Sequence, residues 1–316
     1  MLHRHKSLFV TCVFLFALVE YAEAQRTVPI HFEIGLNEHV GKLIKIHGEY
    51  PPSKLATLTE VSLLWQRFQP YDWQQGYGFP AYGFSLVHAQ FGNQDVLGQS
   101  IAAIPMMRFD RWKGFTRYSL KAGFGLAWFN KPYDAQNNPE NLVIGSRFTN
   151  MSMLRTDVTT QFSDRCTASI GLSFTHCSNS HFAVPNIGAN IVAVHAGLAF
   201  HNRRGVLQLD ESVYSNPSSF PKRRYMWWYS LHSILGFHEA IGTIRPVDGP
   251  RYPVYGIGLF GNKKIAHRIY AVGVNYHYYP YMHDYIISQE LFDASLAKRN
   301  AQTVVVFAGF EWEFGR

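Results

Sequence analysis

Charged residues are scarce in this chain. Asp, Glu, Lys and Arg make up 16% of its 316 residues, whereas soluble domains average about 25%. With 47% hydrophobic and 16% aromatic residues, the composition excludes intrinsic disorder, which needs low hydrophobicity and high net charge. Beyond the first 24 residues the sequence also lacks an apolar run as long as a transmembrane helix requires. Two classes remain: a large soluble β protein and an outer-membrane β-barrel.

Cysteine is rare, with three in the chain. Cys12 lies near the N-terminus, and on one extended strand Cys166 and Cys177 would be roughly 36 Å apart and on opposite faces. Because a disulfide requires Cα atoms within about 7 Å, we expect no intrachain disulfide. The sequence has no CxxC, HExxH or calcium-loop pattern. It therefore indicates no metal site, and we expect no cofactor.

The N-terminus has the pattern of a secretory signal peptide. Arg4 and Lys6 precede an apolar stretch from Ser7 to Val19, and Ala22-Glu23-Ala24 follows as a small-residue cleavage site. We therefore expect residues 1–24 to be removed and the mature chain to begin at Gln25. The net charge of +7 suits a protein that lies beside anionic lipid phosphates.

From about Thr57 onwards, apolar and polar residues alternate, as they do in strands that present one face to each side of a sheet. The clearest segment, Thr303 to Phe314, places Val304, Val306, Phe310 and Trp312 on one face. About twelve such segments are found, at 57–68, 82–91, 96–109, 118–128, 151–162, 166–178, 190–200, 205–213, 227–238, 252–260, 268–278 and 303–314.

Segments of this length with aromatic residues near their ends favour an all-β fold, an antiparallel transmembrane β-barrel of the outer-membrane type with about 8–12 strands. Residues 25–316 would form this single domain in the outer membrane of a Gram-negative cell, with a helical excursion over Met282–Arg299. A soluble β-sandwich also alternates apolar and polar residues and remains the alternative fold.

Three polar residues fall on the apolar faces of two neighbouring segments. His176 and Ser178 continue the face of Phe174, and Asn190 begins the face of Val192. Polar groups against hydrocarbon are costly unless they satisfy one another, and such clusters within a membrane are candidates for function. A serine that a histidine deprotonates, with a third group that orients the imidazole, is the arrangement of an ester hydrolase. The alternative is that these residues are hydrated loop residues at the membrane edge.

The stretch His176-Cys177-Ser178-Asn179, followed by Pro185-Asn186-Ile187-Gly188-Ala189-Asn190, resembles the motif of PagL-type lipid A 3-O-deacylases and their acyloxyacyl hydrolase relatives. The resemblance implies an outer-membrane enzyme that hydrolyses an ester-linked 3-hydroxyacyl chain of lipid A, within lipopolysaccharide, at a lipid-facing site on the barrel wall. It implies Ser178 as nucleophile, His176 as general base and Asn179 as a contributor to the oxyanion hole. It implies no cofactor. Lys/Arg clusters interleaved with aromatic residues also suit nucleic acid, but the signal peptide argues against such a partner.

One position departs from the family pattern. PagL proteins carry a glutamate fourteen residues after the histidine, where this chain has Asn190. We consider three consequences, in order of preference: Asn190 orients the imidazole, Asp210 or Glu211 supplies the acid, or the protein is slow or inactive. In the last case the chain would be a non-enzymatic outer-membrane barrel, a pore or a structural protein with a degraded triad.

Loop lengths predict which end of the barrel bears these residues. Ser163-Asp164 has the length of a periplasmic turn, and residues 179–189 have the length of an extracellular loop. Counting twelve strands back from a periplasmic C-terminus gives the strand at 166–178 the opposite direction. One predicted segment is therefore split, merged or not a strand.

Overall fold

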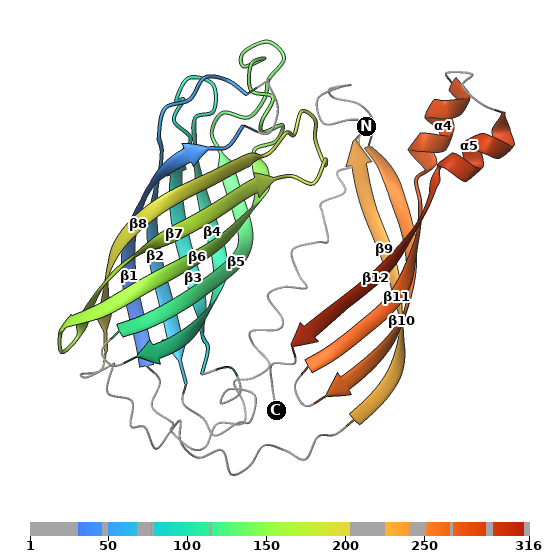
Figure 1. Ribbon diagram of the computed structural model, residues 1–316. Helices are drawn as coiled ribbons and strands as arrows, with labels where there is room; N and C mark the ends of the chain where they lie inside the picture. The colour runs from blue at the N-terminus through green and yellow to red at the C-terminus, as the bar shows by residue number, and fades with distance from the viewer. Residues whose placement is uncertain are drawn as a thin grey trace, which may run out of the picture.

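The computed structural model describes residues 31–45, 50–67, 77, 79–113, 116–202, 225–239, 251–265, 268–288 and 293–312. Eight antiparallel strands form a closed barrel (Figure 1): β1 (His31–Leu43), β2 (Ala56–Gln66), β3 (Ala81–Gln90), β4 (Gln99–Lys113), β5 (Thr116–Phe129), β6 (Phe148–Ser163), β7 (Cys166–Ser178) and β8 (Ala189–His201). β1 pairs with β8 from Glu33–His201 to Leu43–Ile191 and closes the barrel, so none of these eight strands has a free edge.

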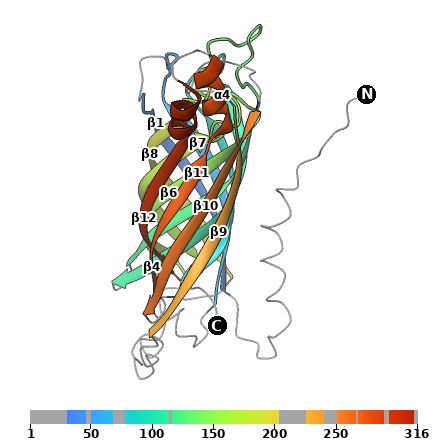
Figure 2. The ribbon, with the colours of Figure 1, turned by 90° about the vertical axis from the view of Figure 1, so that its right-hand side faces the viewer.

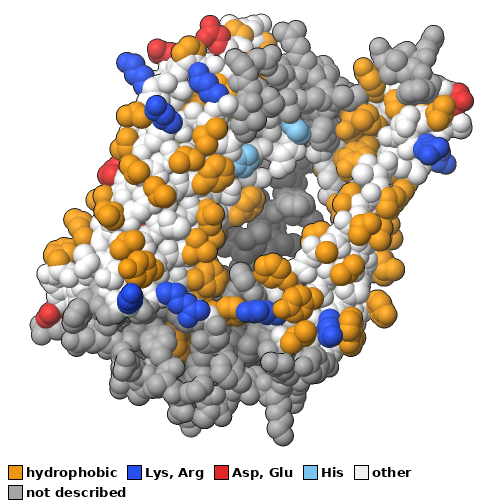
Figure 3. Space-filling model, viewed as in Figure 1, with side chains coloured by type: hydrophobic (Ala, Val, Ile, Leu, Met, Phe, Trp, Pro, Cys, Tyr) orange, Lys and Arg blue, Asp and Glu red, His pale blue; other side chains and the backbone are white. Residues whose placement is uncertain are grey.

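The distribution of side chains in the barrel is the reverse of that in a soluble sandwich. Its outer face is apolar, with Leu36, Leu86 and Ile170 each more than half exposed, and Figure 3 shows hydrophobic side chains spread over it. The interior contains charged residues in pairs: Arg108 Nη1 lies 2.7 Å from Glu33 Oε2. Because a sandwich would place its apolar residues inside, this arrangement excludes the soluble alternative and shows a barrel of the outer-membrane type.

An apolar core fills the interior at the end of the barrel where β7 ends and β8 begins. Its largest members are the fully buried Leu58, Phe91, Ile104, Phe129, Met151 and Ile191. Cys177 belongs to this core and, like Cys166, is a free thiol. The core therefore supports the β7–β8 hairpin from inside.

The remaining described strands form a second sheet. β9 (Tyr225–Glu239), β10 (Arg251–Ile265), β11 (Arg268–Tyr278) and β12 (Gln302–Trp312) are antiparallel neighbours in the order β12-β11-β10-β9. Figure 2 shows them as one continuous sheet. Two short helices, α4 (Pro280–Ser288) and α5 (Ala294–Asn300), connect β11 to β12, where the sequence predicts one helical stretch.

Every described strand except β1 falls on a predicted segment. β1 was not predicted: Glu38 interrupts the outer face of Phe32, Ile34, Leu36 and Val40, and the inner face carries Glu33 and His39. The predicted segment at 205–213 and the predicted signal peptide, residues 1–24, lie outside the described residues. The predicted single domain over residues 25–316 thus includes a closed barrel and a second sheet.

The closed barrel also resolves the direction of β7. With eight strands, the start of β1 and the end of β8 lie at the same end of the barrel as the Ser163–Asp164 turn. β7 then runs from this turn towards residues 179–189, as the loop lengths indicate. The count that gave the opposite direction included the segment at 205–213, which lies outside the described residues.

Candidate active site

His176 and Asn190 form the centre of the candidate site. They are direct partners in the β7–β8 register, and His176 Nδ1 lies 2.8 Å from Asn190 Oδ1. An amide oxygen only accepts hydrogen bonds, so Nδ1 carries the ring hydrogen and donates it. Nε2 is then left with its lone pair, which is the tautomer that a general base requires.

Ser178 lies two residues farther along the same outer face of β7. Its Oγ accepts hydrogen bonds from Asn186 Nδ2 at 3.0 Å and from the backbone N–H of Ser180 at 3.2 Å. No hydrogen bond joins this Oγ to the His176 ring within the part of the chain that the structure describes. The structure thus brings His176 to Asn190 and leaves Ser178 beside them with donors directed at its oxygen.

Gly188 lies against both the histidine and the serine. A Cβ at this position would be 3.5 Å from His176 Cε1 and 3.8 Å from Ser178 Cβ, so no side chain fills the space between the two residues. Gly188 has φ +81°, a left-handed conformation that glycine adopts without strain. A larger residue here would need the left-handed conformation and would add atoms beside His176 and Ser178.

Asn179 and Asn186 hold the loop that follows β7. Asn179 Nδ2 donates to Ala183 O at 2.8 Å and to Ser146 Oγ at 3.0 Å, so its side-chain donors are engaged within the protein. Its backbone N–H donates to Asn186 Oδ1 at 3.2 Å, which turns Asn186 Nδ2 towards Ser178. Asn186 is thus the amide that faces the serine, a role that the sequence reasoning did not assign; its place in the Pro185–Asn190 motif was the available signal.

Tyr50 is a second residue that the sequence reasoning missed. Its phenol donates its one hydrogen to Gly188 O at 2.8 Å. The phenol oxygen therefore accepts the hydrogen bond that joins it to the Asn190 side chain. Burial raises the pKa of Tyr50 above its ordinary value, so the phenol stays protonated and remains a donor at neutral pH. Tyr50 is distant in sequence from the hairpin and belongs to no periodic segment, so no sequence pattern connects it with the site.

The surroundings of the site change from polar to apolar along the strands. Asn150 and Ser152 of β6 are the register partners of Ser178 and His176. One step farther from the loop, the outer face carries the exposed side chains of Leu154, Phe174 and Val192. The site therefore lies at the edge of the apolar outer surface.

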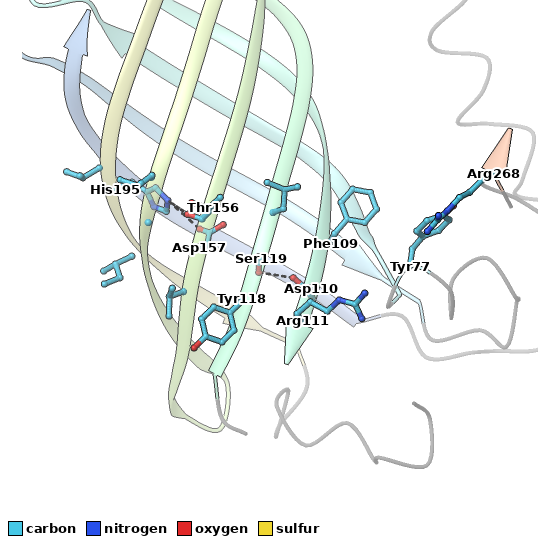
Figure 4. A pocket seen from close by; sticks show the side chains of 16 residues that line it. Tyr77, Phe109, Asp110, Arg111, Tyr118, Ser119, Thr156, Asp157, His195 and Arg268 are labelled. Atoms are coloured by element: carbon cyan, nitrogen blue, oxygen red, sulfur yellow. Dashed lines mark hydrogen bonds and ion pairs between the residues drawn. The ribbon is translucent and has the colours of Figure 1, made fainter. Parts of the chain in front are cut away.

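A groove lies farther along the same wall, lined by residues of β4 to β8 together with Tyr77 and with Arg268 of β11 (Figure 4). Its lining includes four apolar residues from the outer faces of β6, β7 and β8: Val158, Ile170, Leu172 and Val194. Figure 4 also shows Asp157 and His195 joined within this wall. None of the predicted catalytic residues lines the groove.

Asp210 and Glu211, the alternative acids, lie outside the described residues, so Asn190 is the predicted third group whose position is known. Among the residues with described structure, no three His, Cys, Asp or Glu side chains gather as metal ligands. No described helix has the length and apolarity needed to cross a membrane.

Part of the closed barrel matches a known protein family. Residues 59–199 match the family model of lipid A 3-O-deacylase (PagL), which confirms the resemblance seen in the sequence. The match contains His176, Ser178, Asn179 and Asn190. A search of curated proteins finds no match for the chain.

Solved structures of outer-membrane proteins resemble this one. The outer-membrane enzyme PagL is 16% identical, with a TM-score of 0.38 over 52% of this chain and 97% of its own. Neisserial surface protein A is 9% identical, with a TM-score of 0.31 over 54% and 96%. The N-terminal β-barrel domain of Pseudomonas aeruginosa OprF is 9% identical, with a TM-score of 0.30 over 54% and 96%.

Proposed function

We propose that this chain, whose residues 59–199 match the lipid A 3-O-deacylase family, hydrolyses an ester-linked 3-hydroxyacyl chain of lipid A in the outer membrane. The observation that carries the proposal is the 2.8 Å hydrogen bond from His176 Nδ1 to Asn190 Oδ1 on the outer face of the barrel. It leaves Nε2 as a base two residues from Ser178. A structural barrel does not require this tautomer.

Hydrolysis proceeds in two steps. Ser178 Oγ attacks the ester carbonyl carbon while His176 Nε2 accepts the hydroxyl proton, and the carbon–oxygen bond to the sugar then breaks as Nε2 returns that proton to the leaving oxygen. Water next attacks the acyl-serine, His176 accepts and returns a proton, and a free 3-hydroxy fatty acid leaves. Ser178 is restored, and atoms and charge balance without a cofactor.

The tetrahedral intermediate of each step carries a negative oxygen that needs donors. Asn186 Nδ2 and the Ser180 N–H already converge on Ser178 Oγ and are the donors nearest to the carbon that it attacks. Asn179, which the resemblance assigns to the oxyanion hole, acts here by orienting Asn186 through its backbone N–H. A small rotation of the serine side chain towards His176 frees both donors for the oxyanion; catalytic hydrogen bonds are often longer in structures without substrate.

The position of the site suits a substrate at the membrane surface. Lipid A occupies the outer leaflet, and its esters lie between the polar sugar and the acyl chains. The polar residues around Ser178 would face the sugar, while Leu154, Phe174 and Val192 and the groove beyond them would contact the acyl chain. This arrangement supports a lipid-facing site, with the loop at 179–189 on the outer side.

Asn190 determines how fast such an enzyme is. Its amide holds the imidazole as the asparagine of Cys-His-Asn proteases does, but it carries no charge to stabilise the imidazolium that forms. We therefore infer a slow hydrolase that has the correct tautomer.

Mass spectrometry of lipid A tests the proposal. The wild type and Ser178→Ala are expressed in the outer membrane of a host with defined lipid A, and Ser169→Ala, from the inward face of the same strand, serves as the matched control. We expect the wild type and Ser169→Ala to remove one 3-hydroxyacyl chain and Ser178→Ala to remove none. Equal removal by Ser178→Ala would reject the serine mechanism.

A non-enzymatic barrel is the second candidate, favoured by the neutral Asn190 and by the absence of a described Ser178–His176 hydrogen bond. It predicts intact lipid A in every strain. The buried ion pairs and the apolar core inside the barrel favour a structural protein over a pore, since small barrels are filled by side chains.

A further inference from the structure

The second sheet has two edges without a partner among the described strands. β10 pairs with β9 and β11, and β11 pairs with β12, so β9 and β12 each present one free side (Figure 2). The eight-stranded barrel is closed by the β1–β8 pairing and offers neither edge a place. The question is what pairs with β9 and β12.

The two faces of the sheet differ as the faces of a barrel wall do. One face is apolar and exposed, and across the four strands its central row is Leu231, Leu259, Val274 and Val306. The opposite face is mixed, with many small and polar residues, some aromatic residues and a few aliphatic ones: Ser230, His232, Ile234, Val254, Gly256, Gly258, Phe260, Asn262, Ile269, Gly273, Asn275, Val305 and Phe307. This alternation is that of strands with lipid on one side and a barrel interior on the other.

The strands are long enough to cross a membrane. They contain 11 to 15 residues, and a tilted transmembrane strand needs about 9–11. In hydrocarbon, the backbone N–H and C=O groups of a free edge find no water, so open sheets do not persist there. If the protein lies in the outer membrane, as proposed above, each edge of the sheet requires a partner strand.

We propose that the β9–β12 sheet pairs with the same sheet of a second copy of this chain, so that two sheets form one closed eight-stranded barrel. β9 of each copy would pair with β12 of the other. Since the sheet contains four antiparallel strands, β9 and β12 run in opposite directions. A two-fold axis along the barrel therefore makes both new seams antiparallel and identical, as closed symmetry demands.

The interior face favours two copies over three. Phe260 packs against His232, with ring centroids 4.7 Å apart, and against Phe307 at 5.8 Å. An eight-stranded barrel has an interior that side chains fill, which suits these rings and the glycines beside them. Three copies would give twelve strands around a wider space, in which Phe307, already 44% exposed, would face water.

Disulfide cross-linking in outer membranes tests the pairing. In a Cys166→Ser background, a tagged chain with one cysteine on β9, scanned over Tyr229, Leu231 and Ser233, is co-expressed with an untagged chain carrying one on β12, scanned over Val304, Val306 and Ala308. The scan allows for the stagger between strands of a barrel. Leu259→Cys on the central strand β10, which lies on the same apolar face, is the matched control.

We expect a covalent dimer for at least one β9–β12 combination, no dimer when Leu259→Cys replaces either member, and no species larger than a dimer. Trimers from a chain that carries both cysteines would overturn the two-copy barrel. Cross-links within one chain, from β9 to Leu198→Cys on the outer face of β8 or from β12 to Leu36→Cys on the outer face of β1, would show a single twelve-stranded barrel instead.

A second measurement does not depend on the variants. The mass of the wild-type protein in detergent, with bound detergent subtracted, is expected to be that of two chains, and a monomer would refute the proposal. Lipid A hydrolysis is measured in parallel, because a dimer without hydrolysis rejects the proposed function alone, and hydrolysis by a monomer rejects this pairing alone.

Discussion

Replacing Asn190 by aspartate isolates the effect of charge at the candidate triad. Asp and Asn have the same shape, so Asn190→Asp keeps an oxygen at the 2.8 Å position from His176 Nδ1 and adds a negative charge. The tautomer of the imidazole stays the same. At the histidine the variant therefore changes the stabilisation of the imidazolium that forms when His176 accepts the serine proton, and at Tyr50 it removes the amide donor of Asn190.

The expected gain follows from the distance and the burial of the pair. Two unit charges about 4 Å apart attract by about 4 kcal/mol at an effective dielectric constant of about 20, and about 1.4 kcal/mol corresponds to a tenfold change in rate. Asn190 is 7% exposed, so desolvation of the new carboxylate offsets part of the attraction, and so does the lost amide donor to Tyr50, whose one hydrogen goes to Gly188 O. We expect kcat to rise by about 10²-fold.

The assay is the release of 3-hydroxy fatty acid from lipid A in mixed micelles. KM should stay close to the wild-type value, because Asn190 is placed to contact His176 and not the substrate. Heat-modifiable migration in gels verifies that the variant is folded. A folded Asn190→Asp protein with an unchanged or lower kcat would refute the role given to Asn190.

Three further variants test neighbouring parts of the account. Asn186→Ala removes the donor 3.0 Å from Ser178 Oγ and should lower kcat by about 10²-fold, the typical effect of losing one oxyanion donor. Steady-state kinetics measure kcat, and a wild-type kcat would show that another group stabilises the oxyanion. Tyr50→Phe removes the 2.8 Å hydrogen bond to Gly188 O, worth about 1 kcal/mol, and should lower the unfolding temperature as well as kcat, both followed in detergent. Arg155→Leu removes the arginine partner of the fully buried Glu60, which keeps its contacts with His39 and Ser85, and should destabilise the barrel by about 3–5 kcal/mol. Urea unfolding in lipid vesicles measures the loss, and a value below about 1 kcal/mol would contradict the pairing.

The sequence predicted the strand-based features of the site well, because a strand has a fixed period of two. Once β7 and β8 were located, parity alone placed His176, Ser178 and Asn190 on the outer face of one hairpin. The register then makes His176 and Asn190 direct partners, which parity does not reveal. The barrel class followed from the same alternation.

Features that depend on the loops and the interior were beyond sequence reasoning. β1 was missed because charged and polar residues such as Glu33 and His39 face the interior, where Arg108 and Glu60 satisfy them; a single strand does not show such partners. Tyr50 reaches Gly188 through the folding of the loop after β1. The division into a closed barrel and a second sheet depends on pairing between β1 and β8, which lie far apart in the chain.

The central claim is that Ser178 forms an acyl-enzyme with a 3-hydroxyacyl group of lipid A. Purified wild-type and Asn190→Asp proteins are mixed with lipid A in micelles, quenched in acid during the first turnover, and digested for peptide mass spectrometry. The account predicts a 3-hydroxyacyl adduct on Ser178 in both proteins, together with released 3-hydroxy fatty acid, and neither product with Ser178→Ala. Fatty acid release without an adduct on Ser178, and at the same rate in Ser178→Ala, would contradict it.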